Sequence, residues 1–366
     1  MKPLPSARTI APRQLLFFLG CIAPLAKLVL LPAQLAADAK NDLLLSALLP
    51  VALESLSVFA AVLLSKRALS FFALLERSFG RAAATLGSVV LSLFFLFAAY
   101  IPLFEQKLMV QSVFYDTLPS DLLFAPFFLL SVYFCLKPLA SFGRVFDLLG
   151  PLSVLSFAVI VLFSAGEADF AALLPAGISG AKGIFTGAKH ALAWFFDGAL
   201  VLPLLDKIQY KKGLAWKAAA VHLAGGGAVL LFLALFYGIF QGIAPVQFFA
   251  FAKTAKYFPA VGILGRVDYL FIYALALAMI FSSLMPMLSA AELLKEAFGE
   301  SKQKCLLYSL LLNGAMIASS AALGFAFPAA ERFLTRTLVW LFPLFSAALP
   351  LALLLLKGRR RERREA

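Results

Sequence analysis

The sequence predicts an all-α integral membrane protein of about ten transmembrane helices. Of its 366 residues, 63% are hydrophobic and only 14% are charged, a composition typical of membrane-embedded chains. Apolar runs of the roughly 20 residues needed to cross a bilayer recur along most of its length. The polar stretches between them are too short for a soluble domain. We therefore treat residues 1–356 as one transporter-like transmembrane domain, followed by a polybasic tail at 357–366.

Ten apolar segments are the predicted spans, and they divide into two sets of five. Such an arrangement can form the two inverted halves of a transporter, whose internal sequence symmetry is often weak. The first half covers residues 15–165 and the second covers residues 188–356. The spans lie at approximately 15–34, 42–65, 84–104, 121–136, 150–165, 188–206, 217–240, 260–288, 305–327 and 335–356.

The basic residues indicate the orientation of the chain. If the N-terminus is cytoplasmic, the predicted inner segments hold most of the 32 lysines and arginines, in agreement with the positive-inside rule. We therefore predict that both termini are cytoplasmic. The tail KGRRRERREA is suited to anionic lipid, and a plain stop-transfer role is an equal alternative. In a membrane protein, the formal net charge of +13 first indicates topology. Nucleic-acid binding is the poorer explanation of this charge.

Enzyme and metal chemistry find little support in the sequence. Cys21, Cys135 and Cys305 lie in or beside apolar runs, so we expect no disulfide framework. Two histidines, no CxxC motif and no acidic cluster argue against a metal site. An intramembrane enzyme would need a nucleophile–base set, and none stands out. We predict no enzyme activity and no cofactor.

The N-terminal span has one alternative, a cleaved signal peptide. Lys2, Arg8 and Arg13 precede the apolar run, and the segment AQLAADA at 33–39 contains small residues of the cleavage-site type. The apolar run is long for a signal peptide and carries a proline and a lysine. We therefore favour a retained transmembrane helix.

The first span, LLFFLGCIAPLAKLVLLPAQ at 15–34, is the most unusual stretch. Pro24 removes a backbone donor and breaks the helical ladder. Lys27 lies near the middle of the bilayer, where a charged side chain is costly and marks a functional site by default. Two alternatives stay open for Lys27. It can snorkel to the outer interface, or it can form a purely structural pair with Asp197.

The sixth span, HALAWFFDGALVLPLLDKI at 190–208, contains a corresponding interruption. Asp197 and Gly198, with Pro203 downstream, predict an unwinding point near the midplane. Helices 1 and 6 are the equivalent first helices of the two halves, and interrupted segments at such positions indicate a substrate site. Free backbone groups at these breaks can bind the carboxylate and ammonium of an amino acid.

Three further charged residues within the predicted spans are candidates for a role inside the membrane. Glu54 lies near the centre of the second span, where it either faces a polar cavity or forms a hydrogen bond within the bundle. Arg266 and Asp268 lie near the outer end of the eighth span. Their closeness to the interface favours a structural pairing.

Four stretches carry a resemblance to a known family. They are TIAPRQLLFFLG (9–20) with LLPAQLAADAKNDLLLSALL (30–49), SFGRVFDLLGPLSVL (141–155), DFAALLPAGISGAKGIFTGAKHALAWFFDGALVLPLL (169–205) and GRVDYLFIYALALAMIF (265–281). In this order they resemble the permease-like B subunit of endospore nutrient-germinant receptors, within the amino acid–polyamine–organocation transporter superfamily. The resemblance covers nearly the whole chain.

The resemblance implies a 5+5 inverted-repeat fold with broken helices 1 and 6, in the spore inner membrane or cell membrane. Such a subunit binds a small nutrient, an amino acid, between helices 1, 3, 6 and 8. It signals to a larger A subunit and a lipoprotein C subunit. The alternative is a secondary amino-acid or amine transporter that works by alternating access. The residues expected to line the ligand site are Ala23, Leu25, Ala26, Lys27, Tyr100, Phe196, Asp197, Gly198, Ser282 and Ser283.

The chain departs from this family at both helix breaks. The family usually has a small residue, often glycine, where this chain reads CIAPLAK, and it has no lysine there. Asp197 and Gly198 stand where the family often has a glycine–x–glutamate pattern. The family's ligand therefore does not transfer directly to this chain. Lys27 is expected either to fill an ion or ammonium position or to pair with the ligand carboxylate.

Overall fold

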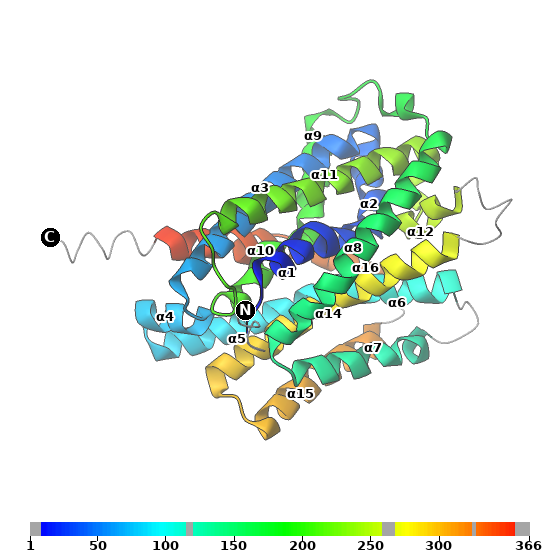
Figure 1. Cartoon of the computed structure of the whole chain (residues 1–366). Helices are drawn as coiled ribbons and strands as arrows, with labels where there is room; N and C mark the ends of the chain where they lie inside the picture. The colour runs from blue at the N-terminus through cyan, green and yellow to red at the C-terminus, as the bar shows by residue number, and fades with distance from the viewer. Residues whose placement is uncertain (1–8, 115–119, 258–267, 324–326, 356–366) are drawn as a thin grey trace, which may run out of the picture.

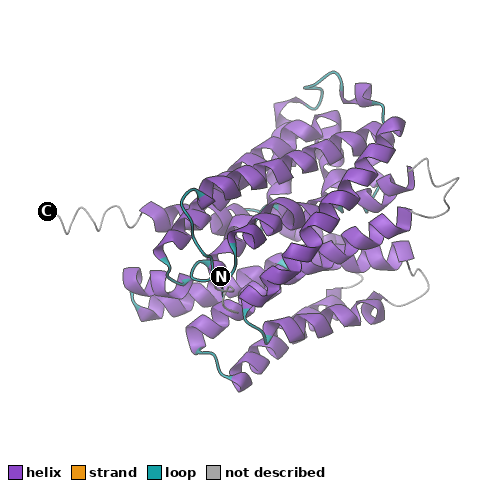
Figure 2. Ribbon diagram, viewed as in Figure 1, coloured by secondary structure: helices purple, strands orange, loops and turns teal. Residues whose placement is uncertain are grey.

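The computed structural model describes residues 9–114, 120–257, 268–323 and 327–355. These residues form helices and short helical turns joined by loops, and they contain no β-strand (Figures 1 and 2). The predicted all-α class is therefore confirmed for this part of the chain.

The first predicted half consists of helices separated by one long interruption near its start. Two consecutive turns, at 18–22 and 23–28, replace regular α-helix there, and Pro24 lies in the second turn. In chain order the elements are α1 (Pro12–Phe17), the π-helical turn η1 (Phe18–Ile22), the 3₁₀ turn η2 (Ala23–Leu28), α2 (Leu31–Ala39), η3 (Lys40–Asp42), α3 (Leu43–Leu64), η4 (Ser65–Arg67), α4 (Phe71–Phe79), α5 (Arg81–Ala98), α6 (Tyr100–Phe114), α7 (Ser120–Cys135) and α8 (Leu139–Ser164).

The second predicted half also begins with an interrupted helix. Its elements, with the turns that precede it, are η5 (Ala165–Glu167), η6 (Phe170–Leu173), α9 (Gly180–Ala191), η7 (Leu192–Trp194), α10 (Asp197–Val201), η8 (Leu202–Leu204), α11 (Leu214–Phe240), η9 (Gln241–Val246), α12 (Ala250–Thr254), η10 (Ala255–Tyr257), α14 (Asp268–Phe298), α15 (Lys302–Leu323), α16 (Phe327–Arg332), η12 (Phe333–Thr337), α17 (Leu341–Pro343) and η13 (Leu344–Ala348).

The described helices identify a multi-pass membrane protein. Six segments are long and apolar enough to cross a bilayer, and a bent pair that meets at 56° would make a seventh. Three predicted spans are not among them. The first and sixth are interrupted, and the fourth is a shorter apolar helix over Phe124–Cys135. The count of ten and the inverted repeat stay predictions. The six segments are Leu31–Arg67, Arg81–Gln111, Ser141–Glu167, Leu214–Val246, Leu270–Phe298 and Lys302–Ala322, and the bent pair is Ala329–Thr337 with Leu341–Leu355.

The interrupted first helix lies between two groups of packed helices. On one side α3 packs against both α9 and α11, and on the other α14 packs against α5 and α8 (Figure 1). The turn η1 contacts α8 and α11, while η2 contacts α11 and α14. The break in helix 1 therefore faces the interior of the bundle, where polar groups must find protein partners.

Close helix approach at this break requires glycine in α11. A Cβ atom added to Gly225 would lie 2.7 Å from the Gly20 carbonyl oxygen and 2.7 Å from Pro24 Cγ. Gly227, two residues along the same helix, would meet nothing within 4 Å. Small residues at helix interfaces let membrane helices approach this closely, so Gly225 positions the break and Gly227 does not.

We predict that Gly225→Ala destabilises the protein while Gly227→Ala does not. Both changes remove the same conformational freedom from α11, which by itself favours alanine by about 0.5–1 kcal/mol. Only Gly225→Ala must displace backbone in helix 1. Thermal unfolding of the purified protein in lipid nanodiscs measures the difference. Equal midpoints for the two variants would contradict the assigned contact.

Candidate functional site

The break in helix 1 carries a buried lysine. Pro24 cannot donate a backbone hydrogen bond, and the helix passes from π-helical to 3₁₀ geometry at Ala23. Lys27 follows within the 3₁₀ turn, and only 3% of its surface is exposed. Its Nζ donates to the Ala23 carbonyl oxygen at 3.3 Å and lies 5.0 Å from the centre of the Phe195 ring. The snorkelling alternative is therefore wrong, because the side chain points inward.

The break in helix 6 presents an acidic residue to this lysine. Phe195 (φ −113°, ψ 88°) and Phe196 (φ −141°, ψ 22°) leave the helical region, and α10 begins at Asp197. Gly198 comes next, where a Cβ would collide with the Ser57 side chain and lie 3.1 Å from the Ser346 carbonyl oxygen. The sequence therefore unwinds helix 6 immediately before a buried carboxylate.

Lys27 and Asp197 form an ion pair across the two breaks. Lys27 Nζ lies 2.8 Å from Asp197 Oδ2, and the exposed fractions of the two side chains are 3% and 5%. His222 Nε2 of α11 lies 3.0 Å from the same oxygen. Its Nδ1 lies 2.9 Å from Ser55 Oγ of α3, which donates to the Val51 carbonyl at 2.8 Å. One carboxylate oxygen therefore joins helix 1, helix 6 and α11.

A second carboxylate supports the start of α10. Glu54 Oε1 of α3 accepts the Gly198 backbone N–H at 2.5 Å, and its Oε2 accepts the Ser346 hydroxyl at 2.5 Å. The Ser57 hydroxyl donates to the Ser346 carbonyl. Backbone N–H groups in the first turn of a helix have no intrahelical acceptor, and Glu54 satisfies one of them. Of the two expected roles for Glu54, hydrogen bonding within the bundle is the one observed.

The other predicted ligand residues do not all gather at this pair. Ala23 is buried beside Lys27, and Ala26 is partly exposed. Leu25 instead lines a small apolar cavity of about 110 Å³ between helix 1, α8 and α11. Phe196 packs against Phe94 and Phe342, with ring centres at 6.4 and 5.8 Å.

Helices 3 and 8 contribute less than expected. Tyr100 lines an apolar groove between α5, α15 and α16 that includes neither residue of the ion pair. Its buried hydroxyl has no partner among the described residues. Ser282 and Ser283 are buried in α14, and the Ser283 hydroxyl donates to the Met279 carbonyl of its own helix. Arg266 lies outside the described residues, and α14 begins at Asp268, whose side chain is not described.

His222 is the functional residue that the sequence alone did not identify. Histidine was considered there only as a metal ligand, and neither histidine belongs to a group of three or more candidate ligands within the described chain. The available signal was a lone histidine in the middle of the apolar run AAAVHLAGGGAVLL. A polar group at that depth needs a partner, and Asp197 supplies it.

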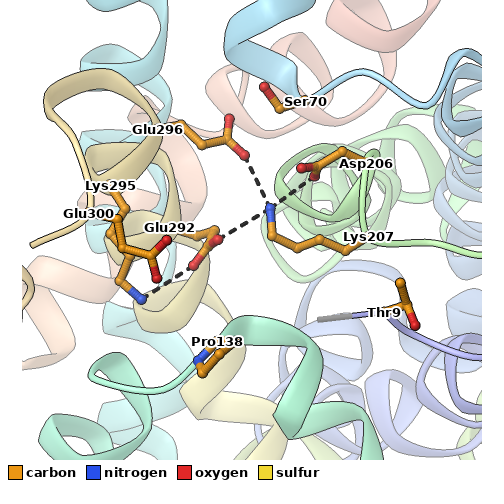
Figure 3. A pocket seen from close by; sticks show the side chains of 9 residues that line it. All are labelled: Thr9, Ser70, Pro138, Asp206, Lys207, Glu292, Lys295, Glu296 and Glu300. Carbon is orange, nitrogen blue, oxygen red and sulfur yellow. Dashed lines mark hydrogen bonds and ion pairs between the residues drawn. The ribbon is translucent and has the colours of Figure 1, made fainter. Parts of the chain in front are cut away.

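A polar pocket of about 390 Å³ lies where helix 6 ends, at the predicted cytoplasmic side (Figure 3). Lys207 Nζ is at its centre, 2.9 Å from Asp206 and 3.2 Å from both Glu292 and Glu296. Lys295 Nζ lies 3.3 Å from Glu292. The pocket is lined by Thr9, Ser70, Pro138, Asp206, Lys207, Glu292, Lys295, Glu296 and Glu300.

These contacts tie the end of helix 6 to α14 and to the N-terminal segment. Ile10 exchanges backbone hydrogen bonds with this region, donating to the Lys207 carbonyl at 2.7 Å and accepting from Gln209 at 3.1 Å. Burial lowers the pKa of Lys207, but the Glu296, Glu292 and Asp206 carboxylates raise it by more, so the pKa lies above its ordinary value. Lys207 is therefore positively charged and links the end of helix 6 to Glu292 and Glu296 of α14.

Comparison with protein families and solved structures gives two findings. A family model described as spore germination protein matches residues 9–322. The chain is also similar to the structure of Mhp1, a nucleobase-cation-symport-1 family transporter, in a closed conformation with bromovinylhydantoin bound. That similarity has a TM-score of 0.51 at 13% identity, and it covers 91% of this chain and 80% of that chain. At this identity it concerns the fold alone. The search of curated proteins found no significant match.

We predict that Asp197→Asn destabilises the protein more than the double variant Lys27→Met with Asp197→Asn. Removing one partner leaves the other charge buried, which costs about 3–5 kcal/mol, whereas removing both leaves no unpaired charge. Thermal unfolding midpoints in nanodiscs measure this, with Lys182→Met on the exposed side of α9 as control. A double variant that loses the sum of both single effects would contradict a direct pair.

We predict that Lys207→Met lowers stability at every pH from about 7 to 9, and that the loss does not shrink as pH rises across this range. A raised pKa in the folded state means that the stabilisation by Lys207 is fully present below the ordinary lysine pKa of about 10.4 and is lost only as pH rises through the higher, folded value. Unfolding midpoints of wild type and variant across this range test the prediction. A gap that closes by pH 9 would show that the carboxylates do not hold Lys207 charged.

Proposed function

The chain belongs to the spore germination protein family, and we propose that it is a nutrient-sensing subunit of a spore germinant receptor. In this proposal it binds a small nutrient, an amino acid, near the middle of the membrane. The observation that carries the proposal is the buried Lys27–Asp197 ion pair, which joins the two interrupted helices at 2.8 Å.

An amino acid is the ligand class that this pair suits best. Its carboxylate can replace Asp197 at Lys27, and its ammonium group can replace Lys27 at Asp197. The exchange inserts a zwitterion between two opposite charges, so no net charge is added to the membrane interior. This matters because an uncompensated buried charge costs several kcal/mol. A neutral sugar would break the ion pair without supplying either replacement charge.

Ligand entry would also change how helices 1 and 6 are held together. In the ligand-free arrangement one oxygen of Asp197 is shared between Lys27 and His222. A ligand that separates Lys27 from Asp197 favours a conformation in which the breaks lie further apart. Binding shifts the population only if affinity differs between the two conformations, and this rearrangement provides that difference. We propose that a larger A subunit and a lipoprotein C subunit receive the signal, with both termini of this chain in the cytoplasm.

The second candidate function is a secondary amino-acid or amine transporter. The similarity of the fold to a cation-symport transporter favours it. The Lys207 contacts would then form the closed cytoplasmic side during alternating access. Both candidates use the same ligand site and differ in the step after binding. Uptake of labelled ligand into liposomes by this chain alone would support transport, whereas a response that requires partner subunits would support sensing.

We predict that a thermal-shift screen of the purified protein finds stabilising ligands among zwitterionic amino acids and none among neutral sugars. Lys27→Met should raise the concentration needed for half-maximal stabilisation by at least about tenfold, which corresponds to about 1.4 kcal/mol. Lys182→Met should leave it unchanged, since Lys182 is exposed on α9. If ligands stabilise both Lys27→Met and Asp197→Asn as they do the wild type, the proposed ligand site is wrong.

A further inference from the structure

A second buried polar group lies on α6, separate from the Lys27–Asp197 pair. The sequence predicts an outer connection from Glu105 onward, but Glu105, Gln106 and Lys107 are 0%, 1% and 4% exposed. Glu105 Oε1 accepts the Trp194 indole N–H at 2.7 Å. Its other oxygen, Oε2, is buried and has no hydrogen-bond partner in the part of the chain that the structure describes, although the Leu30 backbone N–H lies near the carboxylate. This is an unusual state for a carboxylate inside a membrane protein.

A second carboxyl group faces Glu105 from another helix. Glu331 of α16 lies close enough to Glu105 for the two carboxylates to repel. Glu331 accepts a hydrogen bond from Gln34 of α2, and Arg332 and Arg336 provide opposite charge to it. Glu105 therefore faces a second carboxyl group.

Lys107 is the cation on the same helix as Glu105, and its contacts lead toward a different neighbour. Its Nζ donates to the Ser320 hydroxyl of α15 at 2.8 Å and lies 5.4 Å from the Phe104 ring. An ionised Glu105 would be a buried negative charge beside a second carboxyl group, and its Oε2 has no donor among the described residues. Two neighbouring carboxylates in such a site do not both ionise.

We propose that Glu105 holds an exchangeable proton and that, with Glu331, it forms a proton-binding site distinct from the ligand site. In the neutral form only one hydroxyl lacks a partner, which costs far less than an unpaired buried charge. A metal ion fits this site poorly. Hard cations require six or more oxygen ligands, whereas the Trp194 N–H already points at Oε1.

The site contacts both interrupted helices. Trp194 is the last residue of η7, three residues before Asp197 in the break of helix 6. Gln34, which contacts Glu331, lies in α2 beyond the break of helix 1. Any movement that separates Trp194 from Glu105 or Gln34 from Glu331 would change the electrostatics of the bound proton. Coupling of this proton to nutrient binding rests on the proposed function, while proton occupancy of Glu105 does not.

Infrared difference spectroscopy of the purified, ligand-free protein tests proton occupancy. At pH 7 we expect a carbonyl stretch of a protonated carboxylic acid that shifts in D₂O and is lost in Glu105→Gln. The variant keeps an acceptor for Trp194. Asp38→Asn, which alters a carboxylate already bound by His190 at 2.8 Å, is the matched control and should keep the band. A spectrum of Glu105→Gln that matches the wild type at pH 7 overturns the proposal.

A second variant keeps the test informative if Glu105→Gln does not fold. Glu331→Gln removes the neighbouring negative charge, so the band should disappear at a lower pH than in the wild type. An unchanged midpoint would contradict the carboxylate pair.

Thermal unfolding in Na⁺ and in K⁺ at equal ionic strength tests for a metal ion at the same site. If Na⁺ stabilises the wild type more than K⁺ does, and Glu105→Gln removes this difference, the site binds a metal ion and not a proton. Each result is independent of the amino-acid screen, so failure of one proposal is distinguishable from failure of the other.

Discussion

The requirement that a charge buried in the membrane must find a partner governs the centre of this structure. Lys27 and Asp197 are almost fully buried, and each would be costly alone. Their contact at 2.8 Å is possible only because both helices are interrupted at this depth. Pro24 interrupts the first helix, and the non-helical residues Phe195 and Phe196 interrupt the sixth. The helix breaks and the ion pair therefore depend on one another.

The remaining polar contacts at the site hold this arrangement in one geometry. His222 shares the Asp197 oxygen with Lys27, and Glu54 accepts the backbone N–H of Gly198. Ser346 reaches Glu54 from the C-terminal region of the chain. A buried network stabilises a unique conformation when every member is satisfied. If the proposed ligand takes Asp197 away from Lys27, it must also rearrange His222, which would link its entry to movement of several helices.

The sequence was informative where a residue is out of place in an apolar run. Lys27, Asp197 and Glu54 are charges within predicted spans, and Pro24 and Gly198 are helix-disrupting residues, so the broken helices and their charges were predictable. The residues that complete the site were not. Ser55, Ser57 and Ser346 are common in membrane helices, and only packing shows which face inward. Tyr100 was expected at the site from the family's architecture and its approximate depth, but at the start of α6 it lines a groove with residues of α5, α15 and α16.

Glu105 is a polar residue whose burial the sequence did not predict. The run EQKLMVQS after the third span predicts a polar helix extension beyond the membrane. The sequence shows that these residues are polar, but it does not show which other segments bury them. In the folded chain Trp194 and the region around Glu331 enclose it. Trp194 directly precedes the break in helix 6, and Gln34, which contacts Glu331, lies just beyond the break in helix 1. A conformational change at the Lys27–Asp197 pair would therefore also change the surroundings of this carboxylate, under either of the two proposed functions.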